Sequence, residues 1–144
     1  MLLADAAQAL ENKLYIMGGG WTITGPEPTP SAIALYLKIP WDEADRRHRL
    51  RLELLGADGD LVEIDLPDGR KTTLTIENEF EVGRPEGLKP GTPIELSLAL
   101  SLGPLPLPPA SRFEWRLHID DETNDLWTLP FATRVSETES RKAS

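Results

Sequence analysis

The sequence feature that most constrains the fold is a strict alternation of apolar and polar residues along several segments. In TPIELSLALSL, residues 92–102, every even-numbered residue from Ile94 to Leu102 is apolar, whereas the odd-numbered residues between them are small or polar. RFEWRLHID, residues 112–120, alternates in the same way. Successive side chains of a β-strand point to opposite faces of its sheet, so this pattern predicts strands that bury one face.

The same alternation continues in other segments, and short turn motifs connect several of them. The segments are 31–39, 48–56, 61–66, 72–82 and 125–135. Asp58-Gly59 and Asp68-Gly69 are pairs that favour tight hairpins, and they predict an antiparallel meander of three strands over residues 48–82. The polar stretch DETND, residues 121–125, is expected to close a hairpin between the strands that contain Trp115 and Trp127.

Few segments of this chain are candidates for a helix. LADAAQALENKL, residues 3–14, could form an amphipathic turn or two. PWDEADRRH, residues 40–48, is a better short helix, with Asp42 placed as the N-cap after Trp41. We expect one helical turn at most.

These patterns predict an all-β fold. We expect a two-sheet antiparallel β-sandwich, jelly-roll or Ig-like in outline, with about eight or nine strands. A chain of 144 residues has the usual size of a single domain. Residues 1–135 are expected to form that domain, and residues 136–144, which are small and polar, a flexible tail.

Three consecutive glycines, Gly18, Gly19 and Gly20, follow the apolar run KLYI. A phosphate-binding loop would place Lys-Ser/Thr after the glycines or open a helix with G-x-G-x-x-G, and this sequence does neither. The glycines therefore predict a structural bulge that bends a strand. Alternatively the strand continues in one phase, and Gly19 leaves space for a large neighbouring side chain.

The charge balance is acidic, with 24 acidic and 15 basic residues and a formal net charge of −9. Nucleic acids and anionic membranes attract basic surfaces, so we expect neither as a partner. The basic stretch RRHRLR, residues 46–51, is interpreted as charges on the solvent face of a strand. The chain has no cysteine, and its N-terminal segment lacks the basic start of a secretory signal, so we expect a cytoplasmic protein.

Catalytic signatures are missing from the sequence, so we expect a protein that is not an enzyme. It contains two histidines, His48 and His118, and neither G-x-S-x-G nor H-E-x-x-H. His118 alternates with charged residues and is interpreted as a solvent-face side chain. A hydrolase in which His118 or His48 works with a carboxylate is the least favoured alternative.

An acidic loop gives the alternative function, a sandwich that binds calcium or a small ligand, and calcium is the one cofactor considered. Calcium binds six to eight oxygen ligands, and Asp and Asn in the loops of a sandwich can supply them. The candidate ligands are Asp120, Asp121, Glu122, Asn124 and Asp125, although the spacing is not that of an EF-hand. The alternative is a solvated hairpin turn in which these side chains cap their own backbone.

The most favoured function is an interaction module or a self-assembling subunit with a protein partner. Long alternating strands leave sheet edges that invite pairing, which includes pairing between copies in a homo-oligomer. Trp41, beside a proline and an acidic turn, is the preferred anchor of an interface that also includes Asp42, Glu43 and His48. The proline-rich PLPLPP, residues 104–109, is interpreted as a connection between sheets.

Several stretches resemble an uncharacterised bacterial protein family, a domain of unknown function predicted to be a small β-sandwich. They are LLADAAQ, KLYIMGGGW, SAIALYLKIPWDEADRRHRLRLELL, FEVGRPEGLKPGTP and LPLPPASRFEWRLHIDDE. The resemblance covers nearly the whole chain. It implies no activity, cofactor or catalytic residue, so the function has to be argued from the residues themselves.

Overall fold

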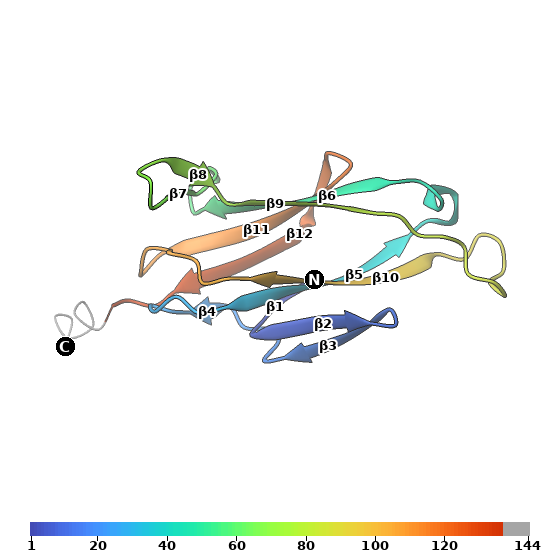
Figure 1. Cartoon of the computed structure of the whole chain (residues 1–144), viewed down its shortest axis with the longest axis horizontal. Coiled ribbons are helices and arrows are strands. Elements are labelled where there is room, and N and C mark those ends of the chain that lie inside the picture. Colours follow the sequence, from blue (N-terminus) through green and yellow to red (C-terminus); the bar gives the residue numbers. More distant parts are fainter. Residues whose placement is uncertain (137–144) are drawn as a thin grey trace.

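Strands make up almost all of the regular structure (Figure 1). The computed structural model describes residues 1–136, which form twelve strands and one 3-10 turn. The elements are β1 (Leu2–Ala4), β2 (Ala6–Leu10), β3 (Lys13–Met17), β4 (Ile23–Thr24), β5 (Ser31–Ile39), η1 (Trp41–Glu43), β6 (His48–Gly56), β7 (Glu63–Asp65), β8 (Lys71–Thr73), β9 (Thr75–Phe80), β10 (Ile94–Leu102), β11 (Arg112–Ile119) and β12 (Glu122–Thr133). The all-β class is therefore confirmed.

Two larger sheets form the body of the protein (Figure 1). One has three strands in the order β1-β5-β10, all antiparallel. The other has five strands in the order β4-β12-β11-β6-β9, in which only β4 runs parallel to its neighbour. The long strands β5 and β10 pair over all nine residues, and the polar side of their alternation points away from the five-stranded sheet.

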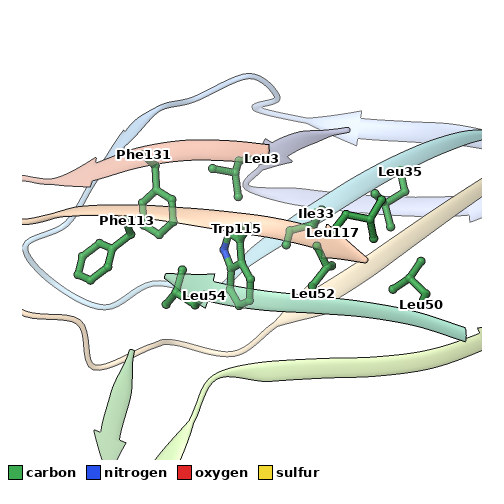
Figure 2. Close-up of a cluster of buried hydrophobic side chains, with 10 residues drawn as sticks. All are labelled: Leu3, Ile33, Leu35, Leu50, Leu52, Leu54, Phe113, Trp115, Leu117 and Phe131. Carbon is green, nitrogen blue, oxygen red and sulfur yellow. The ribbon is translucent and has the colours of Figure 1, made fainter. Parts of the chain in front are cut away.

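One hydrophobic core joins the two sheets. Figure 2 shows the buried side chains of β1 and β5 beside those of β6, β11 and β12. Its members are Leu3, Ile33, Leu35, Leu50, Leu52, Leu54, Phe113, Trp115, Leu117 and Phe131. Leu52 and Leu54 are completely buried. The alternating residues that the sequence places on one face of each strand are thus the residues that meet in the core.

The hairpin β2–β3 lies on the other side of the three-stranded sheet (Figure 1). The face of β5 that points toward it carries Ala32 and Ala34, which are each 1% exposed. Alanines leave room for a second strand layer to approach closely. Asn12, at the tip of the hairpin, ties it to β10: its side chain donates to the Glu95 carbonyl at 2.8 Å and accepts from the Ser97 N–H at 2.8 Å.

The expected count of eight or nine strands is too low, chiefly because the N-terminal segment is extended. Residues 3–14 were a possible helix in the sequence, but they contain the end of β1, all of β2 and the start of β3. Alanine favours helix when a segment is isolated. Here its small side chain is used for close packing between layers, and tertiary packing overrides the local preference.

The predicted three-stranded meander over residues 48–82 is also wrong in its order. β6 pairs directly with β9, while β7 and β8 form a separate two-stranded hairpin. The Asp58-Gly59 turn does form, with a bridge between Leu55 and Leu61. The strands stay paired as far as Val62, whose N–H donates to the Leu54 carbonyl at 2.9 Å. Leu74 then binds both of them: it accepts from the Leu54 N–H at 3.0 Å and donates to the Val62 carbonyl at 3.3 Å.

Two predictions about turns need smaller corrections. Asp42 lies inside the 3-10 turn, and the N-cap position is Pro40, without a side-chain capping bond. The β11–β12 hairpin turns at Asp120 and Asp121, whose φ angles are 51° and 64°, so residues 122–125 belong to β12. Asp tolerates this left-handed conformation better than most residues.

The glycines Gly18, Gly19 and Gly20 form a turn between β3 and β4 rather than a bulge within one strand. Gly18 has a φ of 61°, and a Cβ there would overlap the carboxylate of Asp5. The N–H of Gly20 donates to the Leu3 carbonyl, which ties the turn to β1. Gly18 and Gly19 therefore serve close packing, whereas Gly20, around which a Cβ would meet nothing, serves the turn through its φ of 89°.

The structure describes only the first residue of the predicted tail, and residues 137–144 lie outside the described residues. In residues 1–136, no helix has the length and apolar character needed to cross a membrane.

Candidate functional site

An apolar groove of about 760 Å³ opens between the two larger sheets. One wall is the second half of β5 with Met1, and the other is the tip of the β11–β12 hairpin with Phe80. The lining residues are Met1, Leu35, Tyr36, Leu37, Lys38, Ile39, Pro40, Glu43, His48, Phe80, Leu117, Ile119, Asp120, Glu122, Leu126 and Trp127. Most of them are apolar, and the polar ones are Lys38, Glu43, His48, Asp120 and Glu122.

The groove exists because both sheets are incomplete along this side. β1 pairs with β5 only over residues 32–34, which leaves the edge of β5 beyond Ala34 without a neighbour on that side. β4 likewise pairs with β12 at only two positions, Ala132 and Thr133. The uncovered stretches of β5 and β12 face each other across the space between the sheets.

The tip of β12 gives the groove an exposed apolar rim. The register between β11 and β12 shifts beyond Arg116, so that residues 124–127 bulge out of the ladder. Asn124 stabilises the bulge by accepting from the Leu126 N–H at 2.8 Å. As a result Leu126 is 87% exposed, the highest value for any large apolar side chain in residues 1–136.

His48 is the buried polar group of the groove. It begins β6, is 5% exposed, and its ring stacks on Phe80 with centroids 5.2 Å apart. Its Nδ1 lies 2.7 Å from Asp120 Oδ2, and its Nε2 lies 2.8 Å from the Glu43 carbonyl oxygen. The other carboxylate oxygen of Asp120 accepts from the Arg49 N–H at 2.9 Å.

Both neighbours of the His48 ring are acceptors, which favours the doubly protonated imidazolium. The hydrogen bond to Asp120 is the largest reason that the pKa of His48 is raised, and the bond to the Glu43 carbonyl adds to it. In return, the His48 hydrogen bond and then the Arg49 N–H lower the pKa of Asp120. The pair links the start of β6 to the β11–β12 tip at the end of the groove.

The outer face of the five-stranded sheet carries a network of ion pairs around a depression of about 510 Å³. Arg51 contacts Glu53 and Asp121, each at 2.9 Å. The Asp121 hydrogen bond raises the pKa of Arg51, and the Arg51 bond and the Arg49 charge lower that of Asp121. The sequence prediction that residues 46–51 place their charges on a solvent face is right for the arginines, whereas His48 points inward.

His118 lies on this outer face, as its alternation predicts, but its side chain is only 14% exposed. Its Nε2 is 3.2 Å from Glu53 Oε2 without forming a hydrogen bond. The residues that line the depression include carboxylates but no Ser, Thr, Cys or Lys side chain.

The predicted calcium ligands do not converge on one point. Asp120 binds His48, Asp121 binds the arginines, Glu122 lines the groove, and Asn124 caps the bulge; Asp125 is fully exposed with a carboxylate 3.8 Å from Arg116. Within residues 1–136, no group of three or more acidic or histidine side chains could hold a metal ion. The hairpin-turn alternative describes Asn124 correctly.

The four predicted interface residues divide between two places. Glu43 and His48 line the groove. Trp41 and Asp42 line a separate apolar hollow of about 470 Å³ with Pro40 and Pro93. The Arg84 guanidinium stacks on the Trp41 ring at 4.7 Å and donates to the Trp41 carbonyl at 2.8 Å.

Sequence reasoning missed the apolar residues of the groove, above all Leu37, Leu126 and Trp127. Leu37 and Trp127 were assigned to strand faces, which is correct, but alternation does not show where a face is left uncovered. Leu126 gave a weak signal, because it is a leucine directly after the polar run DETND.

A family model described as "Family of unknown function (DUF6941)" matches residues 1–132. No curated protein and no solved structure matches the chain.

Proposed function

Since the chain belongs to this family of unknown function, we propose a function from the geometry: a non-enzymatic interaction module that binds a partner polypeptide in the groove. In this proposal the two larger sheets act as the layers of a β-sandwich that is open along one side. The observation that carries it is the apolar groove between the uncovered parts of β5 and β12.

The chemistry of the groove supports binding rather than catalysis. Both ring nitrogens of His48 are engaged, so the ring is not free to accept a proton from a substrate. Asp120 is held by two donors. A mostly apolar concave surface with a few fixed polar groups is typical of a binding site.

The exposure of the rim supports a large partner over a small molecule. Leu126 projects into solvent at the mouth of the groove, where it gains nothing from the core of its own chain. Exposed apolar residues beside a groove mark surfaces that proteins bury on association. A partner polypeptide would cover both the groove and this rim.

The test is selection of peptides from a displayed random library on the folded protein, followed by binding of the selected peptides to two variants. Leu126→Asp places a charge on the rim, and we expect it to abolish binding. Leu61→Asp is the matched control, because Leu61 is also exposed, at 43%, and is not among the residues that line the groove. The proposal is refuted if no peptide is selected, or if the two variants bind the selected peptides equally well.

Sedimentation of the free protein separates partner binding from self-assembly. A dimer that Leu126→Asp dissociates would identify a second copy of this chain as the occupant of the groove, and so would replace the proposed partner with self-association. A monomer, together with peptides that bind the groove, supports a different partner.

A further inference from the structure

We infer that the groove binds its partner as an added β-strand, antiparallel to β5 along Leu35–Ile39. This inference rests on the proposed function, and specifies how the polypeptide is held. It follows from the direction of the backbone groups of β5, the position of β1, and the charge at the groove mouth.

The direction of the backbone groups can be worked out from β10. Asn12 binds the Glu95 carbonyl and the Ser97 N–H, so these groups point away from β5. In an antiparallel pair the N–H and C=O of one residue point to the same side, and the direction alternates along the strand. The even-numbered residues of β10 therefore direct their backbone N–H and C=O groups toward β5. Their partners in β5 are odd-numbered residues.

It follows that Tyr36 and Lys38 direct their backbone N–H and C=O groups to the opposite edge of β5. Further back along the strand, the same edge is paired with β1 through Ala32 and Ala34. Beyond Ala34 no strand of residues 1–136 continues the ladder. Two donors and two acceptors are thus left along an edge that borders an apolar groove.

This arrangement favours an extended partner over a helix. A helix satisfies its own backbone groups and would leave those of Tyr36 and Lys38 unpaired, whereas an added strand pairs all four. The side chains of the added strand would alternate, with every second one directed between the sheets toward Leu117 and Ile119. The partner segment is therefore expected to alternate apolar and polar residues.

The charge at the groove mouth further defines the partner. Glu122 lines the groove and has no ion-pair partner within residues 1–136. The other two carboxylates of the groove are already bound, Asp120 to His48 and Glu43 to Arg46, and Lys38 lines the β5 wall. A basic residue beside the apolar positions of the partner would complement Glu122. A second copy of this chain, with its net charge of −9, fits less well.

The existing register gives a direct test. Leu2 pairs with Ala34 and Leu3 with Ile33, so residues added before Met1 would pair in turn with Tyr36, Leu37, Lys38 and Ile39. An extension Val-Thr-Val-Thr before Met1 would direct both valines into the groove. The extension Thr-Val-Thr-Val has the same composition and directs them outward, which makes it the matched control.

The measurement is amide hydrogen exchange by NMR on the full-length protein with each extension. The in-phase extension is expected to slow exchange of the Tyr36 and Lys38 amides at least about fivefold, the effect of one added hydrogen bond. It should also block binding of the selected peptides. The out-of-phase extension should do neither. If the Tyr36 and Lys38 amides each exchange at the same rate in the protein without an extension and in both extended proteins, the inference is overturned.

This experiment distinguishes failure of the inference from failure of the proposed function. If peptides that depend on Leu126 still bind the protein with the in-phase extension, strand addition is wrong and the groove remains the binding site. If no peptide depends on Leu126, the proposed function itself is wrong, and the inference falls with it.

Discussion

Replacing Asp120 with Asn should reverse the pH dependence of the contribution that His48 makes to the free energy of unfolding. In the native protein, Asp120 and the Glu43 carbonyl both accept hydrogen bonds from the ring, and they raise the pKa of His48. A group whose pKa is higher in the folded than in the unfolded state stabilises the protein fully below its unfolded value, about 6.5 for His, and loses this contribution as the pH rises through the folded value.

The D120N substitution changes the partner of Nδ1 from an acceptor to a potential donor. The amide oxygen can still accept from the Arg49 N–H, and Asn tolerates the φ of 51° at this position. The amide N–H₂ then suits a neutral ring, which accepts at Nδ1 and donates from Nε2 to the Glu43 carbonyl. The substitution therefore removes the advantage of the charged ring and favours the neutral one.

The expected size of the effect follows from the two kinds of hydrogen bond. A bond to a charged group contributes about 1.5–3 kcal/mol, and one between neutral groups about 1 kcal/mol. The Asp120 side chain is 48% exposed, so solvent screening reduces the difference to about 0.5–1 kcal/mol. We expect D120N to lower the free energy of unfolding by this amount at about pH 6, and by much less at about pH 9.

The assay is urea denaturation followed by tryptophan fluorescence at both pH values. Asp125→Asn is the matched control, because it removes the same charge from the same hairpin at a fully exposed side chain that does not contact histidine. If D120N and Asp125→Asn lower stability equally at both pH values, the charged His48–Asp120 pair does not exist in solution.

Three other perturbations test the fold and the site. Asn12→Ala removes both side-chain hydrogen bonds to β10, so it should lower the free energy of unfolding by about 1–3 kcal/mol and speed amide exchange at Ser97; unchanged exchange there would refute the docking of the hairpin. Gly18→Ala should lower the melting temperature more than Gly20→Ala, since both glycines have positive φ but only Gly18 would overlap Asp5; equal effects would refute the packing argument. Millimolar calcium should leave the melting temperature unchanged, because Asp120 and Asp121 are held by His48 and arginines; a rise would show that calcium binds the folded state.

The sequence was sufficient to predict the strands that form the core except β1, because alternation is a local property. Leu96, Leu98 and Leu100 fall on one face at a spacing of two wherever the strand lies in the sheet. The pairing of strands was less predictable. The Asp58-Gly59 turn was correct, yet the two strands that it joins stay paired only as far as Val62, and Leu74 then binds both of them. No local pattern reveals that contact.

The candidate site was harder to predict because its parts come from distant segments. His48 and Asp120 are 72 residues apart, and each has an ordinary local interpretation, as a strand residue and as a turn residue. The groove depends on the short pairing of β1 with β5, which ends at Ala34. The length of that ladder follows from where the chain enters the sheet, and alternation carries no information about it.

The docking of the N-terminal hairpin on β10 has a consequence for synthesis of the protein. The tip residue Asn12 binds the Glu95 carbonyl 83 residues further along the chain. At about 5–20 residues per second, the ribosome delivers that partner roughly 4–17 seconds after the hairpin. During this interval Leu14, which is partly buried in the folded protein, lacks the sheet on which the hairpin docks, so we expect chaperones to bind the newly made hairpin.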